Sequence, residues 1–318
     1  MPMSPLFQWL SPAGSRARLS TLIFHRVVPE PDPLFPGEVD ASRFDAICQW
    51  IRRWFHVLPL DEAVQLRAEG RLPSRALGIS FDDGYADNHD VALPILARHG
   101  LNATFFVATG FLDGGRMWND TLIELVRRWP SDTMDLSAHQ IPGIQALDLS
   151  TLEARRQAAA SLTLAMKYLP AAARSEQVAA IARRSDVTLP DYLMMTSDQV
   201  RALHRAGMRI GAHTVNHPIL RTLDDDAARS EITAGRQRLQ EIIGAPVRLF
   251  AYPNGKPGQD YVERDVALVR ACGFDAAFTT QAGYSTATTP AHELPRFTPW
   301  RSDRWGFGLQ LARNLAGA

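Results

Sequence analysis

The stretch Ser80-Phe81-Asp82-Asp83-Gly84 places two adjacent carboxylates at the end of the apolar run Ala76–Phe81. The run predicts a buried strand. Because consecutive side chains of a strand point to opposite faces, both acids can serve one site only where the strand stops and the backbone turns. Gly84 permits such a turn. We therefore expect Asp82 and Asp83 at the carboxyl end of a strand, beside a cavity.

Two histidines farther along the chain complete a candidate metal site. The stretch His213-Thr214-Val215-Asn216-His217 offers two imidazoles four residues apart, which a helical turn would bring onto one face. Two His and one Asp make a three-ligand site with open coordination positions, the mark of a catalytic metal. Such a metal lowers the pKa of water to about 7 and polarises a carbonyl, so that an amide or ester becomes open to attack. Adjacent ionised acids repel unless they share a cation, and we assign Asp83, His213 and His217 as ligands and Asp82 as the base.

Apolar runs alternate with helical patterns along most of the chain, which argues for a parallel sheet. The predicted strands are Thr21–Phe24, His56–Leu58, Ala76–Phe81, Ala103–Val107, Met208–Ala212, Val247–Ala251 and Asp275–Thr279. The predicted helices between them are Ala41–Phe55, Leu60–Glu69, Asn88–His99, Ser197–Ala206, Asp225–Ile243 and Asp260–Ala271. Polar residues directly follow several strands: His25, Asp82, Asp83, His213 and the stretch Tyr252-Pro253-Asn254-Gly255. In a closed barrel these carboxyl ends share one rim, so we predict an α/β barrel.

The alternation is interrupted between Trp118 and about Met195, where helical patterns cover Trp118–Trp129, Leu152–Leu169 and Ala173–Arg184. We predict a helical insertion of the kind that barrels carry at the active-site rim. The expected organisation is an N-terminal arm over residues 1–20 and one domain over residues 21–318, with the insertion at about 118–195. Trp118, Asn119 and Asp120 open the insertion. They either line a substrate subsite by stacking and hydrogen bonding or form a helix N-terminus with a buried Trp.

Composition excludes several classes of function. Of the 318 residues, 46% are hydrophobic and 21% are charged, as in an ordinary globular protein with a sizeable core. Lys plus Arg and Asp plus Glu both number 34, so no net field attracts nucleic acid or an anionic membrane. Cys48 and Cys272 are too few for a disulfide framework or a Cys-rich zinc site, and we expect them reduced and buried.

Neither end of the chain predicts a membrane span. The N-terminal residues lack the order of a secretory signal, and no run approaches the roughly 20 apolar residues of a membrane helix. The expected location is therefore the cytoplasm. The C-terminal stretch Glu293–Ala318 contains an extended segment, Leu294–Phe297, and then an amphipathic helix. Its stripe of Trp305, Phe307, Leu311 and Leu315 either packs on the barrel, which we favour, or makes a peripheral membrane contact.

Residues Ser80–Gly84 and His213–His217, in this order, resemble the first two motifs of the polysaccharide deacetylases of carbohydrate esterase family 4, the chitooligosaccharide deacetylase homology domain. Those motifs are Thr/Ser-Phe-Asp-Asp-Gly and His-Ser/Thr-x-x-His. The resemblance spans roughly Leu22 to Pro299. It implies a distorted (β/α)7 TIM-like barrel, a divalent metal and the removal of N-acetyl groups from amino sugars. The implied metal is zinc first, with nickel, cobalt or iron as alternatives, and the family's roles fall on the same four residues.

The third motif departs from the family. It is usually Arg-x-Pro-Tyr-Gly, and here Ala251-Tyr252-Pro253-Asn254-Gly255 has Ala251 where the Arg would be. The Arg that normally holds the catalytic Asp must come from elsewhere, and Arg296 is our candidate; the alternative is a plain salt bridge. Tyr252, Pro253 and Asn254 are candidate substrate or oxyanion residues, since the backbone N–H of Asn254 can replace that of the usual Tyr.

The usual general-acid motif, Leu-x-His near the C-terminus, is absent from the sequence. His25, at the end of the first predicted strand, resembles the rearranged order of deacetylases acting on bacterial exopolysaccharides, where this His comes first. It would protonate the departing amine. The alternative is a core histidine satisfied by backbone groups.

These features predict a metal-dependent N-deacetylase acting on an N-acetylated sugar oligomer, polysaccharide or glycolipid precursor, in exopolysaccharide or glycolipid synthesis. Two alternatives remain open. One is an amidohydrolase acting on a small cytosolic amide, ureide or formyl-amino sugar. The other is a non-catalytic carbohydrate-binding barrel that has lost its acid or its Arg.

Overall fold

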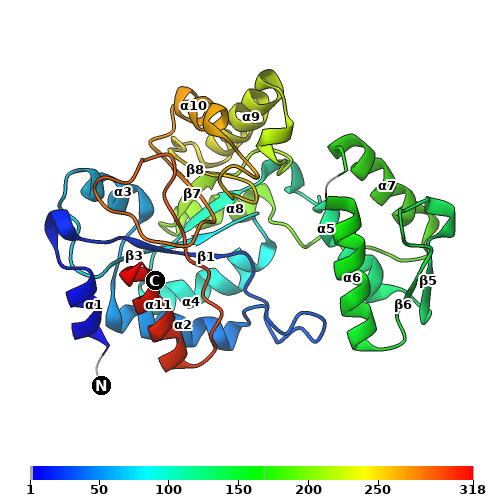
Figure 1. Cartoon of the computed structure of the whole chain (residues 1–318), viewed down its shortest axis with the longest axis horizontal. Coiled ribbons are helices and arrows are strands. Elements are labelled where there is room, and N and C mark those ends of the chain that lie inside the picture. The colour runs from blue at the N-terminus through cyan, green and yellow to red at the C-terminus, as the bar shows by residue number, and fades with distance from the viewer. Residues whose placement is uncertain (1–2, 168, 318) are drawn as a thin grey trace. The chain divides into compact units, whose positions relative to one another are not determined.

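The computed structural model describes residues 3–167 and 169–317 (Figure 1). Met1, Pro2, Tyr168 and Ala318, which the predicted arm, insertion and C-terminal helix include, lie outside the described residues. The chain forms two compact units. The first comprises Met1–Glu30, Val39–Asp113 and Met195–Ala318, and the second comprises Pro31–Glu38 and Gly114–Met194. The predicted division into an arm and one domain with an insertion stays a prediction.

The first unit contains a parallel sheet of seven strands with the order β1-β3-β4-β7-β8-β9, and β2 also pairs with β3. All seven strands expected from the sequence are present. They are β1 (Ser20–Phe24), β2 (His56–Val57), β3 (Ala76–Phe81), β4 (Thr104–Val107), β7 (Arg209–Ala212), β8 (Leu249–Ala251) and β9 (Ala276–Phe278). Strands of a parallel sheet that is covered on both faces are typically continuous apolar runs, and such runs can be recognised in the sequence.

An extended segment near the C-terminus closes the sheet. Leu294 forms a parallel bridge with Phe278 of β9, and Phe297 forms one with Leu22 of β1. The backbone N–H groups of Leu294 and Phe297 donate to the neighbouring strands at 2.9 and 2.7 Å. The edges of β9 and β1 are thereby joined, and the predicted distorted (β/α)7 barrel is confirmed.

The distortion lies at β2. Leu77 of β3 pairs with Ser20 of β1 and also with Val57 of β2, so β1 and β2 flank β3 on opposite sides. At its other end β3 pairs with β4 through Ser80 and Phe81. Since β1 spans the whole length of this pairing, β2 and β4 lie one after the other on the same side of β3.

Helices surround this sheet, with α9 and α10 on one side of it and α2, α4 and α11 on the other (Figure 1). Their bounds are α1 (Ser4–Leu10), α2 (Ala41–Trp54), α3 (Leu60–Ala68), α4 (Leu93–His99), α8 (Ser197–Arg205), α9 (Asp225–Ile243), α10 (Glu263–Ala271) and α11 (Arg304–Ala316). A π-helical turn, η2 (Asn88–Ala92), precedes α4, and the short 3-10 turns of this unit are η1 (Gly14–Arg16), η3 (Thr109–Phe111) and η5 (Leu220–Thr222). Helix α9 matches the sequence prediction at both ends, because Asp224 caps its first turn and Gly244 ends it at φ +67°.

The helices at both termini pack onto the barrel. Phe7 of α1 is fully buried, and its ring lies 5.8 Å from that of Trp54 and 4.4 Å from that of Phe55. In α11 the predicted apolar stripe divides: Phe307, Leu311 and Leu315 are buried, whereas Trp305 is 54% exposed. Within the described residues, no helix combines the length and the apolar character needed to cross a membrane.

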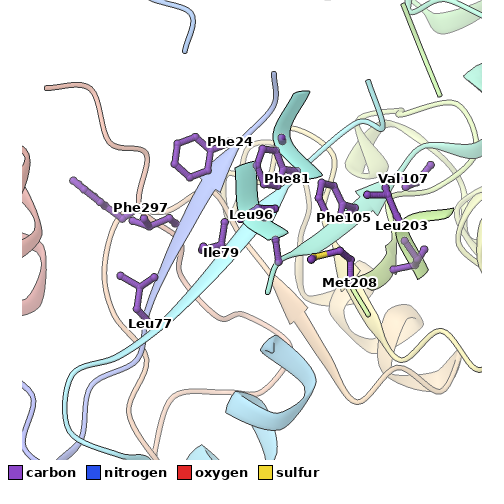
Figure 2. Close-up of a cluster of buried hydrophobic side chains, with 14 of the residues drawn as sticks. Phe24, Leu77, Ile79, Phe81, Leu96, Phe105, Val107, Leu203, Met208 and Phe297 are labelled. Carbon is purple, nitrogen blue, oxygen red and sulfur yellow. The ribbon is translucent and has the colours of Figure 1, made fainter. Parts of the chain in front are cut away.

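The main hydrophobic core lies between the strands and the helices outside them. Phe81 of β3 stacks on Phe105 of β4 at 4.8 Å, and Phe24 of β1 lies 5.5 Å from Phe81 (Figure 2). Phe44 of α2 meets Phe81 edge-on at 5.6 Å. Burying one such side chain stabilises the fold by about 1.5–3 kcal/mol. Since Phe81 faces outward to the helices, its neighbours Ser80 and Asp82 face the barrel interior.

The interior of the barrel has its own apolar layer, formed by Leu60, Val64, Phe106, Leu249, Ala251, Ala276, Phe278 and Leu294. Leu60 of α3 reaches in beside β3, where a Cβ on Gly78 would lie 2.1 Å from its side chain. A Cβ on Gly211 of β7 would lie 2.3 Å from Phe106. Glycine at these two positions therefore makes room for the side chains of this apolar layer, which fills the interior of the barrel.

The second unit is mainly helical, with α5 (Trp118–Arg128), α6 (Leu152–Lys167), α7 (Ala171–Arg184) and the turn η4 (Ser137–His139). It also contains a two-stranded antiparallel sheet of β5 (Thr133–Asp135) and β6 (Ala146–Asp148), which the sequence did not predict.

The two cysteines belong to the first unit and are free, Cys48 buried as expected and Cys272 only partly buried.

Candidate active site

The carboxylate of Asp82 is held inside the barrel by Arg296. Arg296 Nη1 donates to Asp82 Oδ1 at 2.6 Å, and Nη2 donates to Oδ2 at 2.7 Å. Arg296 also donates from Nη1 to Ser80 Oγ at 3.2 Å and from Nε to the carbonyl of Thr279 at 2.9 Å. The two charged side chains are 1% and 2% exposed, so this is a buried, bidentate ion pair. The arginine missing from the third motif is thus replaced at Asp82 by one from the closing segment.

This pairing keeps Asp82 ionised. Burial would raise the pKa of Asp82, but the charges of Arg296 and His213 outweigh it and lower the pKa below its ordinary value. Asp82 therefore stays a carboxylate at neutral pH, as a proton acceptor must. Its role as base remains a prediction.

Asp83 turns away from the strand and faces the two histidines. Its φ is +74°, and Gly84 follows at +93°. Asp83 Oδ1 lies 3.5 Å from Nε2 of His213 and 3.4 Å from Nε2 of His217. One ligand atom from each of the three residues lies within 4.8 Å of the others. The structure thus brings together the three side chains that the sequence assigned to a metal.

The two histidines do not share a helical face, which corrects the sequence prediction. His213 directly follows β7, and residues 213–217 form an irregular bend. Thr214 and His217 have φ values of +66° and +52°, which no right-handed helix contains. The hydroxyl of Thr214 accepts the N–H of His217 at 3.1 Å and closes the bend. We call residues 213–217 the histidine loop.

The donor atoms of this cluster fit a divalent cation. Nδ1 of His213 lies 2.7 Å from the carbonyl of Ala251, and because a carbonyl can only accept, Nδ1 carries a proton. Whenever the ring is neutral, the lone pair is therefore on Nε2, which faces Asp83. Asp83 Oδ1 is buried and has no hydrogen-bond partner among the described residues. A buried carboxylate oxygen facing imidazole lone pairs is costly unless a positive charge lies between them. One carboxylate and two imidazoles are ligands that zinc accepts.

Protonation of the cluster follows from the same charges. Burial lowers the pKa of His217 to about 4, despite the opposing charge of Asp83, so its ring is neutral at pH 7. Burial also disfavours a charged His213, but Asp82 and Asp83 prevail and raise its pKa. Burial would raise the pKa of Asp83, yet the neighbouring imidazoles of His217 and His213 hold it well below its ordinary value. In the metal-free protein a proton on His213 therefore partly takes the place of a cation.

Strained backbone is concentrated around these side chains. Asp83, Thr214, His217 and Asn254 all have left-handed φ values, between +52° and +74°. For residues other than glycine such a conformation costs of order 1–3 kcal/mol each and persists only where the surroundings hold it. Interactions elsewhere in the first unit must therefore offset the cost of these four left-handed conformations.

His25 lies at the carboxyl end of β1, next to the acids. The N–H of Asp82 donates to the carbonyl of Phe24 at 2.9 Å, so His25 and Asp82 are at neighbouring strand ends. Its charge contributes to the low pKa of both Asp82 and Asp83. The side chain of His25 is exposed, which excludes the alternative of a buried core histidine.

Two residues that sequence reasoning missed fix the backbone around His25. Asp87 accepts Arg26 Nε at 2.8 Å and the N–H of Val27 at 3.1 Å. Nδ2 of Asn88 donates to the carbonyl of His25 at 2.8 Å. Their only signal in the sequence is that they closely follow Gly84.

The third motif divides into structural and accessible groups. Tyr252 is buried, its hydroxyl donates to the carbonyl of His292 at 3.0 Å, and its N–H donates to that of Phe278 at 3.1 Å. Neither polar group is available to a substrate, which corrects the prediction for Tyr252. Pro253 is also buried and has no N–H. Asn254 is half-buried, and its N–H has no hydrogen bond in the described part of the chain, so its predicted oxyanion role stays open.

The three residues that open the predicted insertion belong to the second unit. Trp118 begins α5, with the guanidinium of Arg174 at 4.7 Å above its ring. Nδ2 of Asn119 lies 3.5 Å from Oδ1 of the buried Asp120. These contacts agree with a helix N-terminus, and the sugar subsite stays a prediction.

Comparison with known proteins now adds to this geometry. The sequence model of the family described as polysaccharide deacetylase matches residues 69–277, more than half of the chain. The chain belongs to the polysaccharide deacetylase family. Membership confirms the resemblance noted from the motifs.

Individual deacetylases show the same relation. A putative polysaccharide deacetylase of Bacillus subtilis, YxkH, is 30% identical over 93 residues, which are 29% of this chain and 32% of the relative. The poly-β-1,6-N-acetyl-D-glucosamine N-deacetylase of Staphylococcus aureus is 24% identical over 181 residues, which are 54% of this chain and 60% of the relative. The chain thus matches less than two thirds of the length of these curated relatives.

Solved deacetylase structures share the fold. The Streptococcus pyogenes deacetylase PplD, in complex with acetate, has a TM-score of 0.59 and 18% identity over 89% of this chain and 92% of its own. IcaB from Ammonifex degensii has a TM-score of 0.58 and 18% identity over 96% of this chain and 98% of its own. At this identity the likeness supports the distorted barrel alone.

Proposed function

We propose that this chain removes N-acetyl groups from the amino sugars of a polysaccharide or glycolipid precursor, with a divalent metal, zinc first, at Asp83, His213 and His217. The observation that carries the proposal is the convergence of these three donors directly beside the buried pair of Asp82 and Arg296. The family and the relative named as a poly-β-1,6-N-acetyl-D-glucosamine N-deacetylase support the choice of substrate.

Each residue has a separate task in this reaction. A bound metal would supply positive charge that polarises the acetamide carbonyl and lowers the pKa of water. Asp82 accepts the proton of the attacking water, while Arg296 keeps the carboxylate ionised and fixes its direction. The N–H of Asn254 donates to the oxygen that becomes negative. His25 gives a proton to the departing nitrogen as the C–N bond breaks, so that acetate and a free amine are released.

The test is acetate release from a panel of acetylated substrates. The panel contains N-acetylglucosamine, its β-1,4- and β-1,6-linked oligomers and an N-formyl sugar, each assayed with the metal-free protein before and after adding zinc. We expect zinc-dependent acetate release from the oligomers and free amines in the products by mass spectrometry. A zinc-loaded protein that releases no acetate from any of them would contradict the proposal.

The same panel addresses the two alternatives. Hydrolysis of the formyl sugar or of a small ureide, without acetate release, would favour the small-substrate amidohydrolase. A non-catalytic barrel requires that the arginine or the acid be lost. The bidentate contact of Arg296 with Asp82 and the exposed ring of His25 at the neighbouring strand end argue against that alternative.

A further inference from the structure

The histidine loop is held by a carboxylate that sequence reasoning did not single out. Glu231, in the second turn of α9, accepts three hydrogen bonds from this loop. Its Oε2 accepts the N–H groups of Val215 and Asn216 at 2.9 and 2.8 Å, and its Oε1 accepts Asn216 Nδ2 at 2.7 Å. Successive N–H groups beside a left-handed residue form a concavity that favours an anion. The partly buried carboxylate of Glu231 fills it.

Helix α9 also approaches the loop more closely than a side chain would allow. Gly235 lies four residues after Glu231, on the same face of the helix. A Cβ at Gly235 would lie 2.7 Å from the carbonyl oxygen of Thr214 and 2.8 Å from its carbon. Glycine at this position therefore lets the helix bring Glu231 within hydrogen-bonding distance of the loop.

A second element holds the other side of the loop. In η3, the N–H of Thr109 donates to the carbonyl of Thr214 at 3.3 Å, and the N–H of Gly110 donates to that of Val215 at 2.8 Å. A Cβ at Gly110 would lie 2.8 Å from the carbonyl oxygen of Val215. The backbone of the loop is thus clamped between η3 and α9.

This clamp matters more for one histidine than for the other. His213 continues β7 and is oriented by the carbonyl of Ala251 at 2.7 Å. Within the described residues, the ring of His217 makes no hydrogen bond; its Nε2 lies 3.4 Å from Asp83 Oδ1, and its ring centroid lies 4.8 Å from that of His213. Its direction is therefore set by the backbone that carries it.

We propose that Glu231 is a positioning residue of the metal site: it fixes the histidine loop so that Nε2 of His217 faces Asp83 in the metal-free protein. The inference rests on the metal site of the proposed function and is independent of the sugar. Partners in the outer shell of a metal site typically change metal affinity by about 10- to 100-fold when they are removed.

The experiment measures zinc affinity, by competition with a chelator, for the wild-type chain and for Glu231→Ala and Glu231→Gln. Glu231→Ala should bind zinc about 10- to 100-fold more weakly. Glu231→Gln should fall in between, because its single amide oxygen replaces two acceptors and its NH2 group faces donors. In the metal-free proteins, amide hydrogen exchange at Val215 and Asn216 should be faster in both variants than in the wild type.

Glu241→Gln is the matched control. Glu241 is also on α9 and is exposed, and its only hydrogen bond within the described part of the chain is the one it accepts from Gln237 Nε2 at 3.0 Å. It should leave zinc affinity and exchange in the loop unchanged. If Glu231→Ala does not fold, Glu231→Gln decides by the same two measurements.

A folded Glu231→Ala or Glu231→Gln variant with wild-type zinc affinity and wild-type exchange would overturn the inference. A wild-type chain that binds zinc at this site but releases no acetate would instead overturn the proposed function alone. A wild-type chain that binds no zinc would overturn both.

Discussion

Replacing Arg296 with methionine tests whether Asp82, the proposed base, is kept ionised by its buried partner. Methionine retains an unbranched aliphatic chain at a position that is 1% exposed, but it lacks the guanidinium and so removes both hydrogen bonds to Asp82. The carboxylate then remains buried without its main counter-charge. Burial, the largest influence on the pKa of Asp82, is no longer opposed by Arg296.

The size of the effect has a limit set by protonation. Removing one partner of a buried ion pair costs about 3–5 kcal/mol in free energy of unfolding. Asp82 can avoid part of this cost by taking up a proton. Starting from its ordinary pKa of 3.8, protonation at pH 7 costs about 4 kcal/mol at about 1.4 kcal/mol per pKa unit. We therefore expect Arg296→Met to lower the free energy of unfolding at pH 7 by about 3–4 kcal/mol.

The loss should depend on pH. In the wild type the folded pKa of Asp82 is lowered, so its contribution to stability is present above the unfolded pKa and is lost as the pH falls through the folded pKa. In Arg296→Met the folded pKa is raised above the unfolded value. The contribution of neutral Asp82 to the stability of the variant is then present at low pH and is lost as the pH rises. The difference between the two proteins should therefore increase from about pH 4 to neutrality.

Urea unfolding followed by circular dichroism, with a chelator present, measures these free energies. The double variant Arg296→Met/Asp82→Asn should recover most of the stability, because no charge is left buried, and should remain inactive. Arg248→Met is the control, because its pair with Asp275 is exposed and should contribute less than about 1 kcal/mol. A single variant as stable as the wild type at pH 7, or a double variant no more stable than the single one, would refute the reasoning.

Three further outcomes are expected. Asp82→Asn should keep zinc at full stoichiometry and lose acetate release, whereas Asp83→Ala should lose both. Metal analysis and the acetate assay distinguish the two variants, and zinc retained by Asp83→Ala would count against Asp83 as a metal ligand. Zinc binding should release protons, because zinc competes with protons for His213, whose pKa is raised, so zinc affinity should fall as the pH falls. Calorimetry in buffers of different ionisation enthalpy measures this release. Gly235→Ala should destabilise the chain in thermal unfolding. The added Cβ would lie 2.7 Å from the carbonyl oxygen of Thr214, and such overpacking costs about 1–3 kcal/mol. This cost exceeds the gain of about 1 kcal/mol in helix propensity.

The strands of the barrel could be predicted because their physical cause is local. A strand buried on both faces must be apolar along its length, and this rule accounts for the strands other than β2, whose His56 is exposed. The candidate ligands could be predicted because Asp83 and His213 come within two residues of the end of such a strand, and His217 lies four residues after His213. The hairpin of β5 and β6 was missed for the opposite reason: its strands have three residues each and are mostly exposed, so no alternation of apolar and polar residues develops.

What could not be predicted depends on backbone conformation and on distant partners. The spacing His-x-x-x-His is the same for a helix and for a bend, and nothing in the residue types of Thr214 and His217 signals a left-handed φ. Glu231 resembles any acid on a solvated helix face, because its partners in the histidine loop come from a different strand end. The core position of Tyr252 depends on its stacking with Tyr261 at 3.9 Å, which only the folded chain brings about.

The adjacency of Asp82 and Asp83 explains how one strand end can supply two opposed chemical roles. Asp82 keeps the direction of the strand, points into the barrel and meets a guanidinium, which fixes it as an ionised carboxylate. Asp83 leaves the strand at φ +74° and turns its unpartnered oxygen to two imidazoles. Two carboxylates this close would otherwise repel and share a proton. Because each has its own source of positive charge, both can stay ionised, and the left-handed backbone at Asp83 is what separates them. The strain at this residue is thus a requirement of the site.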